Sequence, residues 1–193
     1  MTLKYGYEVP LSPQSLEAVL EEAVRYEKAG FDVVWLPDHT LCFPSERCLI
    51  PEAFVTLAGI ARETKKILLA TGVTDVHRRS VVLLAQNVAT LDQLSGGRAV
   101  LGLGRGESMN LDPFEIPWDK PVARTLEAVE VLKKLWIEDA PFDFSGKFFT
   151  VNEGWLQIPP VQRPHPPIFH GSQSPATYPL TGKYFDGWYP AMT

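Results

Sequence analysis

Three short apolar segments recur at nearly equal intervals along the chain, and this spacing constrains the fold more than any other feature. The segments 31–36, 66–73 and 98–103 begin 35 and 32 residues apart. That interval is the length of one strand followed by one helix. Strands that are almost continuously apolar are typical of a parallel sheet that is buried on both faces. The spacing therefore predicts an α/β fold built on a parallel sheet.

The rest of the chain continues the alternation of strands and helices. A strand is expected over 5–9, and Ser12 and Pro13 offer an N-cap and first turn for the helix that follows, which Gly30 ends. Pro51 is expected to open the next helix. Further helices are predicted over 81–94 and 122–136, a β-hairpin over 142–149, and strands over 168–171 and 186–189.

About six strand–helix units fit a (β/α)8 TIM barrel that is incomplete at its C-terminus, because such barrels typically need about 250 residues. The chain has 193 residues. The hairpin would be an insertion after the fourth unit, so residues 1–193 are predicted to form a single, C-terminally truncated domain. The alternative is an open, doubly wound sheet, which binds its ligand at one switch point. The barrel is favoured because chemically useful residues follow several different strands.

Composition excludes several classes of function. The net charge of −5 comes from interspersed acids and bases, so neither nucleic acid nor an anionic membrane is expected as a partner. The N-terminal residues lack the apolar core of a signal peptide, and no segment approaches the roughly 20 apolar residues of a membrane span. A cytoplasmic protein is expected. Cys42 and Cys48 are interpreted as two ordinary thiols, without a metal or a disulfide.

Polar residues and glycines stand at the ends of the predicted strands. They are Glu8, Asp38, His39, Gly72, Val73, Thr74, Gly104, Glu107, Gly171, Ser172 and Gln173. The C-terminal ends of the strands of a barrel meet at one face, so these residues are expected to converge there. Glu107 and His39 are the best candidates for acid and base catalysis. Glycines before Glu107 would let a planar ligand approach the backbone closely.

A structural interpretation stands beside each functional one. Asp38 could cap the next segment, His39 could be a structural histidine, and Glu107 could be a solvated loop acid. The segment 171–175 offers backbone amides, hydroxyls and a helix N-terminus to a phosphate, but it could equally be the plain start of a helix. Residue type alone leaves these alternatives open.

Four motifs together resemble one family. They are Thr71-Gly72-Val73-Thr74, the segment 91–98, the segment 101–107 with Asn110, and the segment 167–175. In this order they are similar to the bacterial-luciferase-like superfamily, and more narrowly to its coenzyme F420-dependent reductases, which include methylene-tetrahydromethanopterin reductase. The resemblance covers nearly the whole chain. It implies a TIM barrel with the hairpin insertion, in agreement with the expectation from the residues.

The resemblance also implies roles for individual residues. Glu107, His39 and Glu8 match catalytic positions. The cofactor-binding positions would be Asp38, Gly72, Val73, Thr74, Gly104, Asn110, Gly171, Ser172, Gln173, Ser174 and Pro175. Within this set the family places a cis peptide bond at Gly72–Val73, behind the deazaflavin ring. A catalytic tryptophan of the related alcohol and sugar-phosphate dehydrogenases is replaced by Phe43, which weighs against those two substrates.

The function implied is hydride transfer between coenzyme F420 and a small carbonyl, imine or alcohol substrate, by a homodimer. An FMN-dependent monooxygenase of the same superfamily is the nearest alternative. The chain stops after the sixth predicted strand, whereas the family has eight. A fragment, a chain completed by a partner, or a non-catalytic flavin- or partner-binding relative would each explain this difference.

Overall fold

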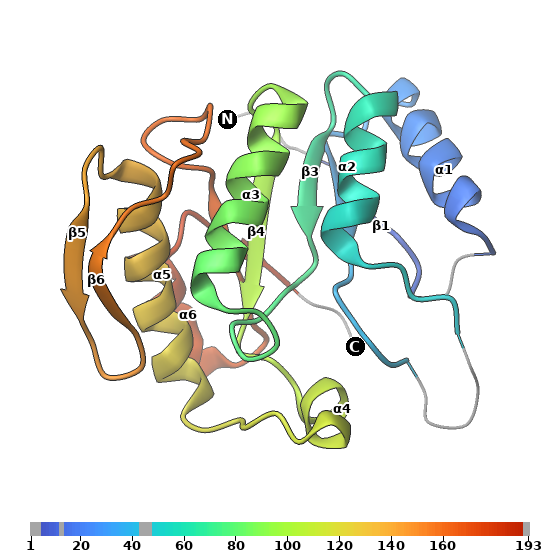
Figure 1. The fold of residues 1–193 in the computed structure, drawn as a ribbon. Coiled ribbons are helices and arrows are strands. Elements are labelled where there is room, and N and C mark those ends of the chain that lie inside the picture. Colours follow the sequence, from blue (N-terminus) through green and yellow to red (C-terminus); the bar gives the residue numbers. More distant parts are fainter. Residues whose placement is uncertain (1–4, 12–13, 43–47, 191–193) are drawn as a thin grey trace.

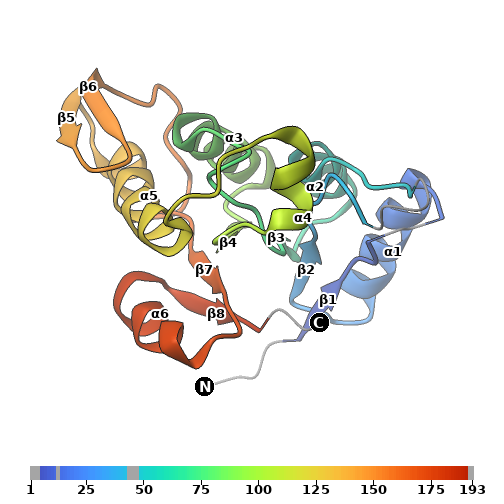
Figure 2. The same ribbon diagram turned by 90° about the horizontal axis from the view of Figure 1, so that it is seen from below.

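The computed structural model describes residues 5–11, 14–42 and 48–190. Its centre is a six-stranded parallel sheet, whose strands follow the order β1-β2-β3-β4-β7-β8. The strands are β1 (Gly6–Glu8), β2 (Val33–Leu36), β3 (Leu68–Thr71), β4 (Ala99–Gly104), β7 (Ile168–Gly171) and β8 (Gly187–Tyr189). The sheet curls, and Figure 2 shows it as an arc that is open between β8 and β1. The predicted incomplete TIM barrel is confirmed.

Helices cover the convex face of the curled sheet (Figure 1). They are α1 (Leu16–Lys28), α2 (Ala53–Glu63), α3 (Val81–Ser95), α5 (Pro121–Ile137) and α6 (Tyr178–Tyr184), with a 3-10 turn, η2 (Pro175–Thr177), before α6. The main apolar core lies between these helices and the sheet, and it includes Leu57, Leu84, Leu101 and Leu132, all with no exposed surface. Each strand–helix unit therefore buries the apolar residues that gave the alternation in the sequence.

Side chains at the helix ends explain where the helices begin and stop. The Ser15 hydroxyl caps α1 by accepting a hydrogen bond from the Ala18 amide, so α1 begins later than predicted. The predicted Ser12 and Pro13 cap lies outside the described residues. Helix α2 is capped by the Glu52 carboxylate rather than opened by Pro51. Helix α3 ends as predicted at Gly96, which takes the left-handed conformation at φ 70°.

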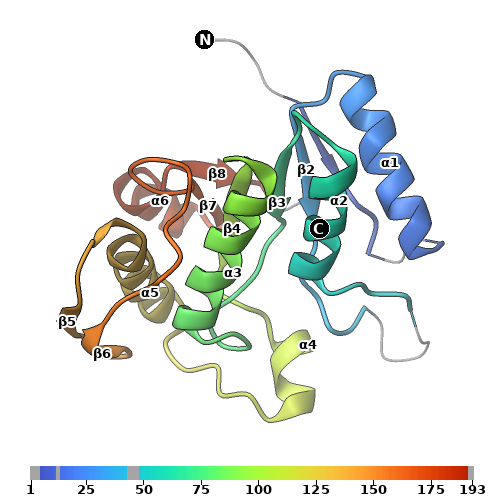
Figure 3. The ribbon, with the colours of Figure 1, turned by 45° about the horizontal axis from the view of Figure 1, so that its top comes forward.

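The predicted hairpin is present and consists of β5 (Phe142–Ser145) and β6 (Thr150–Gly154). It follows α5 and packs beside that helix, away from the parallel sheet (Figure 3). The Glu127 carboxylate of α5 accepts hydrogen bonds from the amides of Lys147, Phe148 and Phe149 in the hairpin turn. This contact fixes the insertion outside the barrel, so the hairpin leaves the mouth of the barrel uncovered.

The concave face of the sheet is lined differently from the convex face. Along β4, Leu101 and Leu103 join the main core, whereas Val100 points inward to a second cluster with Trp35, Ala70 and Tyr189. Alternation along a strand places residues 102 and 104 on the same inner side as Val100. Both are glycine, so β4 itself projects no side chain into the half-barrel at its C-terminal end.

Two features differ from the sequence-based expectation. Cys42 and Cys48 form a disulfide, which corrects the prediction of two ordinary thiols. Their Cα atoms are 6.6 Å apart, within the range that a disulfide spans. A short helix, α4 (Ser108–Leu111), and a 3-10 turn, η1 (Asp112–Phe114), follow Glu107 and were not predicted.

No helix among the described residues has the length and apolarity that crossing a bilayer requires.

Candidate active site

A cavity of about 580 Å³ lies at the C-terminal ends of the strands. Among the sequence-predicted site residues, its walls contain Glu8, Asp38, His39, Gly72, Val73, Thr74, Gly104, Glu107, Asn110, Gly171 and Gln173. Ser172, Ser174 and Pro175 lie beside it without lining it. With Tyr189 of β8, which also lines it, all six strands of the sheet and the α4 segment contribute to one cavity, as expected from the barrel geometry. Its volume falls within the roughly 300–1,000 Å³ typical of small-molecule sites.

The floor of the cavity is a bulge after β3. Thr71 and Thr74 both bond to β4, and the Gly72 amide still donates to the Leu36 carbonyl of β2, whereas the Val73 side chain turns inward towards the glycines of β4 and β7. The Gly72–Val73 peptide bond is cis, as the resemblance implied. The Val73 side chain lies where side chains from the neighbouring strands would otherwise project. This explains why those strands end in glycine.

Glycines of β4 and β7 make room for the bulge. A Cβ atom at Gly104 would lie 2.7 Å from Val73 Cγ2, and one at Gly171 would lie 2.7 Å from both Val73 methyl groups. A Cβ atom at Gly102 would lie 1.9 Å from the Thr71 carbonyl oxygen. The sequence suggested that the glycines before Glu107 let a ligand approach the backbone, which stays a prediction. The structure shows that the strand glycines also admit Val73, whose side chain gives the cavity an apolar surface.

His39 and Glu107 meet on the wall of the cavity. Nε2 of His39 lies 3.2 Å from Oε1 of Glu107, although the two residues follow different strands, β2 and β4. The side chain of His39 is 19% exposed and that of Glu107 is 50% exposed. Asn110, from α4, donates to the same Glu107 oxygen at 2.8 Å. The pair is therefore accessible from the cavity and held by a buried amide.

Asp38, the residue before His39, is buried, and its carboxylate is bound by the side chains of two arginines. Both carboxylate oxygens accept hydrogen bonds from Arg79, at 2.9 and 2.8 Å, and one also accepts from the Thr74 hydroxyl at 2.5 Å. Arg78 lies 3.2 Å from the same carboxylate. Burial would raise the pKa of Asp38, but the Arg79 hydrogen bonds and both arginine charges outweigh it, so the pKa lies below its usual value. These contacts fix the start of the segment that carries His39.

Glu8 faces a tyrosine that sequence reasoning missed. Tyr189, at the end of β8, is buried, and its side chain lies close to the Glu8 carboxylate of β1 in the wall of the same cavity. Burial is the main reason that the pKa of Tyr189 is raised, and the contact with Glu8 adds to it. The ring also packs 4.5 Å from Trp35, centroid to centroid. The contact joins the two edges of the half-barrel, which no sequence pattern could have revealed.

The segment 171–175 is engaged largely with its own turn. The Ser172 hydroxyl bonds the Thr177 hydroxyl, and the Ser172 carbonyl accepts from the Trp188 indole at 2.8 Å. The helix that follows, α6, has only seven residues. Gly171 and Gln173 alone reach the cavity wall. A phosphate-binding role of this segment stays a prediction.

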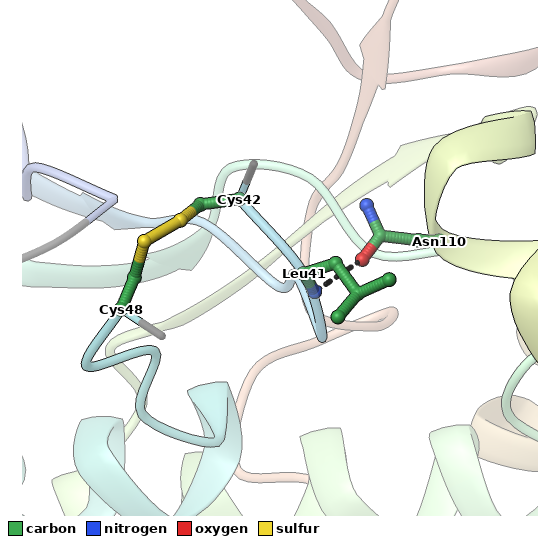
Figure 4. The surroundings of a disulfide bond; sticks show 4 residues. All are labelled: Leu41, Cys42, Cys48 and Asn110. Carbon is green, nitrogen blue, oxygen red and sulfur yellow. Dashed lines mark hydrogen bonds between the residues drawn. A yellow bond between two sulfur atoms is a disulfide. The ribbon is translucent and has the colours of Figure 1, made fainter. Parts of the chain in front are cut away.

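The disulfide lies next to the site. Cys42 lines the cavity and is 4% exposed. Figure 4 shows the Cys42–Cys48 bridge beside Leu41, whose amide donates to Oδ1 of Asn110 at 2.9 Å. The loop that begins at His39 is therefore held at two points, by the bridge and by Asn110.

Phe43, which replaces the family's tryptophan, lies outside the described residues. Metal-binding groups of three or more His, Cys, Asp or Glu side chains are not found among the residues described.

Comparison with known proteins extends these observations. The model of the luciferase-like monooxygenase family matches residues 4–193. The 5,10-methylenetetrahydromethanopterin reductase of Archaeoglobus fulgidus is 33% identical over 186 residues, covering 96% of this chain and 52% of the relative. The F420-dependent glucose-6-phosphate dehydrogenase of Amycolatopsis mediterranei is 30% identical over 191 residues, covering 96% of this chain and 56% of the relative.

A solved structure has the same arrangement of strands and helices. It is an F420-dependent secondary alcohol dehydrogenase in complex with an F420-acetone adduct, with a TM-score of 0.87 and 33% sequence identity. The match covers 97% of this chain and 58% of that chain. This chain therefore spans little more than half the length of the proteins it matches.

Proposed function

We propose that this chain, which belongs to the luciferase-like monooxygenase family, transfers a hydride between coenzyme F420 and a small carbonyl, imine or alcohol substrate. One observation carries the proposal. His39 and Glu107 come from the ends of two strands and meet at 3.2 Å on the wall of a cavity whose floor is the Val73 bulge. Relatives named as F420-dependent enzymes support the choice of coenzyme.

The cavity fits a flat ring on geometric grounds. Val73 offers an apolar surface, and the absence of side chains at Gly104 and Gly171 leaves space beside it. Glu107 and His39 stand at one side of this surface, and Glu8 with Tyr189 stands at another. Backbone and apolar groups below a ring, with polar groups at its edges, are typical of sites for aromatic cofactors. Gly72, Val73, Thr74, Gly104, Gly171 and Gln173 would hold the coenzyme.

Bound coenzyme F420 would supply the hydride chemistry, and the residues of this chain supply orientation and protons. The Glu107 carboxylate accepts a hydrogen bond from Asn110 and lies 3.2 Å from Nε2 of His39, so the two side chains stand together at the cavity wall. Glu107 or His39 would take a proton from an oxygen or nitrogen of the substrate as the hydride leaves, and would return it in the reverse reaction. Glu8 is a second acid at the mouth, and it lies beside the Tyr189 side chain.

The homodimer implied by the family also belongs to this proposal. Helices α2 and α3 are neighbours, and three apolar side chains near their N-termini are exposed: Val55 at 74%, Val82 at 51% and Leu83 at 47%. A cluster of exposed apolar side chains on adjacent helices is a common feature of protein interfaces. A second copy of the chain would cover this face.

Spectroscopic titration tests the choice of cofactor. Purified protein is titrated separately with oxidised coenzyme F420 and with FMN, and changes in absorbance and fluorescence are recorded. Saturable binding of F420, tighter than that of FMN, is the expected result. Tight binding of FMN with no response to F420 would instead favour the monooxygenase of the same superfamily. Binding of F420 without turnover of any alcohol, aldehyde or imine would favour the non-catalytic alternative.

A further inference from the structure

We propose that Tyr189 is a further ligand-binding residue, whose phenol hydroxyl donates a hydrogen bond to a carbonyl oxygen at the edge of the flat ring that rests on Val73. The inference rests on the proposed function in one respect, which is that the cavity binds a flat ring. The place of the hydroxyl follows from the register of three strands and from the packing of the tyrosine side chain.

Tyr189 belongs to a row of residues that otherwise lacks side chains. In the parallel sheet, Gly104 of β4 pairs with Gly171 of β7, and Gly171 pairs with Tyr189 of β8. Because side chains alternate between the two faces along each strand, residues paired in this way share a face, which here is the inner one. Of the three positions, only that of Tyr189 carries a side chain into the half-barrel.

The tyrosine side chain reaches across the interior of the half-barrel. Its ring packs on Trp35 of β2, with 4.5 Å between the ring centroids, and belongs to the inner apolar cluster. Its hydroxyl oxygen lies at the end of β3, 3.3 Å from the position that a Cβ atom of Gly72 would occupy. A side chain from β8 therefore ends against the bulge, and it lines the cavity together with Gly72 and Val73.

The hydroxyl is a hydrogen-bond donor beside the apolar floor of the cavity. Tyr189 is 7% exposed, and the carboxylate close to it is that of Glu8, which is exposed. Burial, with the charge of Glu8, raises the pKa of the phenol, so the hydroxyl keeps its hydrogen near neutral pH. Water can solvate the exposed Glu8 carboxylate, so the phenol hydrogen can turn to a ligand without leaving Glu8 unsolvated.

The ligand group that fits this position is an uncharged carbonyl oxygen. A flat ring that rests on Val73 turns its edge towards the groups beside the bulge, and the rings of flavins and deazaflavins carry carbonyl oxygens along one edge. A carbonyl oxygen only accepts, and a protonated phenol can donate to it. An anionic group at the same place would be set against the Glu8 carboxylate, which disfavours a phosphate or a carboxylate there.

Binding of the ring by Tyr189→Phe tests the inference. Phenylalanine keeps the ring that packs on Trp35 and removes only the hydroxyl. F420 and FMN are titrated separately into the wild-type protein and the variant, without substrate, and the dissociation constant is measured for each ring that binds. We expect the dissociation constant to rise about 3- to 10-fold in the variant, which is the effect of losing one hydrogen bond between uncharged groups.

Tyr7→Phe is the matched control. The Tyr7 hydroxyl also faces a glutamate, because it donates to Glu22 at 2.6 Å, but Tyr7 does not line the cavity. Its removal should leave the dissociation constant unchanged. Vibrational spectra of the saturated complexes give a second measurement. The stretching frequency of a ring carbonyl should be higher in Tyr189→Phe than in the wild-type complex, because a hydrogen bond to the oxygen lowers it.

The outcomes separate this inference from the proposed function. An unchanged dissociation constant in Tyr189→Phe, an equal loss in Tyr7→Phe, or a loss without a shift of the carbonyl band would overturn the inference and leave hydride transfer with F420 in place. Binding of FMN alone would contradict the choice of coenzyme, and the same comparison made with FMN would then decide the role of Tyr189. A wild-type protein that binds neither ring would overturn both.

Discussion

The Val73 side chain enters the half-barrel only because three strand positions around it lack a side chain. Gly104 and Gly171 flank its methyl groups, and Gly102 lies under the carbonyl of Thr71. Valine is stiff at χ1, so its methyl groups cannot rotate away at little cost. The shape of the cavity floor therefore depends on glycines in strands that are distant in sequence from the bulge.

Replacement of Gly171 by alanine should show this dependence. The new methyl group would meet both Val73 methyl groups at 2.7 Å, and overpacking of this kind costs about 1–3 kcal/mol in the free energy of unfolding. Adding Val73→Ala to Gly171→Ala should recover much of the loss in urea denaturation. Gly182→Ala is the matched control, because no atom lies within 4 Å of its Cβ. A double variant no more stable than the sum of its singles would contradict this account.

Glu107→Gln separates binding from catalysis at the same scale. The amide has nearly the same shape as the carboxylate but cannot take up a proton, so turnover should fall by about 100-fold or more. The dissociation constant for F420 should change little, because Glu107 stands at the edge of the cavity and is 50% exposed. Steady-state kinetics and the fluorescence titration measure the two quantities. Equal turnover by the variant would remove Glu107 from the mechanism.

At the scale of elements, the strands and helices could be predicted because the buried side chains of each element form a regular apolar pattern within a short stretch of sequence. Helix α3 was predicted within one residue, since apolar side chains repeat at helical spacing and Gly96 ends it. The path of the chain between elements could not be predicted in this way. The Cys42–Cys48 bridge, α4 and the Glu8–Tyr189 contact all depend on loops or on strands that meet only in the folded molecule.

The motif at 91–98 shows how a recognised pattern can have a structural role. Asp92 has no exposed surface, and its carboxylate accepts hydrogen bonds from the amides of Val161 and Gln162 and from the Gln162 side chain. It thereby ties the proline-rich connection to α3. The guanidinium of Arg98 donates to the carbonyls of Ala61, Thr64 and Ile67. Resemblance alone identified this segment, but it could not separate residues that hold the fold from residues that line the cavity.

The junction between β7 and α6 predicts a dependence of stability on pH. His170 is 5% exposed, lies 2.7 Å from the Thr181 hydroxyl and stacks on Phe185. Burial lowers the pKa of its ring, so below the unfolded-state value of about 6.5 the unfolded chain binds a proton that the folded chain does not. The free energy of unfolding should therefore fall as the pH drops from about 7.5 to about 5.5.

His170→Gln tests the origin of this effect. Glutamine retains a polar partner for Thr181 but does not titrate in this range, so the difference in stability between the two pH values should become smaller. Burial also lowers the pKa of His77, so part of the difference should remain. Urea denaturation at both pH values gives the comparison. An unchanged pH difference in the variant would show that His170 does not contribute.

At the scale of the whole molecule, the exposed face of α2 and α3 predicts assembly. Sedimentation should show a dimer, and Val55→Glu should shift it towards monomer, because a charge would be buried at the interface. Val55 is 74% exposed in the single chain, so the substitution should leave the fold of the monomer intact. Ile137→Glu is the control, since Ile137 is similarly apolar and 48% exposed but ends α5. A monomeric wild-type protein would contradict the proposal.

The half-barrel brings distant loops to one cavity although its sheet is open. Within the described residues, β1 and β8 each pair with a single neighbour, and the Glu8–Tyr189 contact joins them at the mouth. His39 and Glu107, on the segments after β2 and β4, line the same cavity. The residues to which we assign cofactor orientation and proton transfer thus line one cavity of this chain.

Hydride transfer itself is the most direct test of the central claim. Oxidised coenzyme F420 is incubated with the wild-type protein and a panel of small alcohols, and the reverse reaction uses reduced coenzyme with aldehydes, ketones and imines. In the reaction with alcohols, the substrate carries deuterium at its reacting carbon, and mass spectrometry of the coenzyme shows whether this deuterium has been transferred. We expect deuterium to appear in the coenzyme with at least one substrate. Tight binding of the coenzyme with no transfer from any substrate would contradict the account.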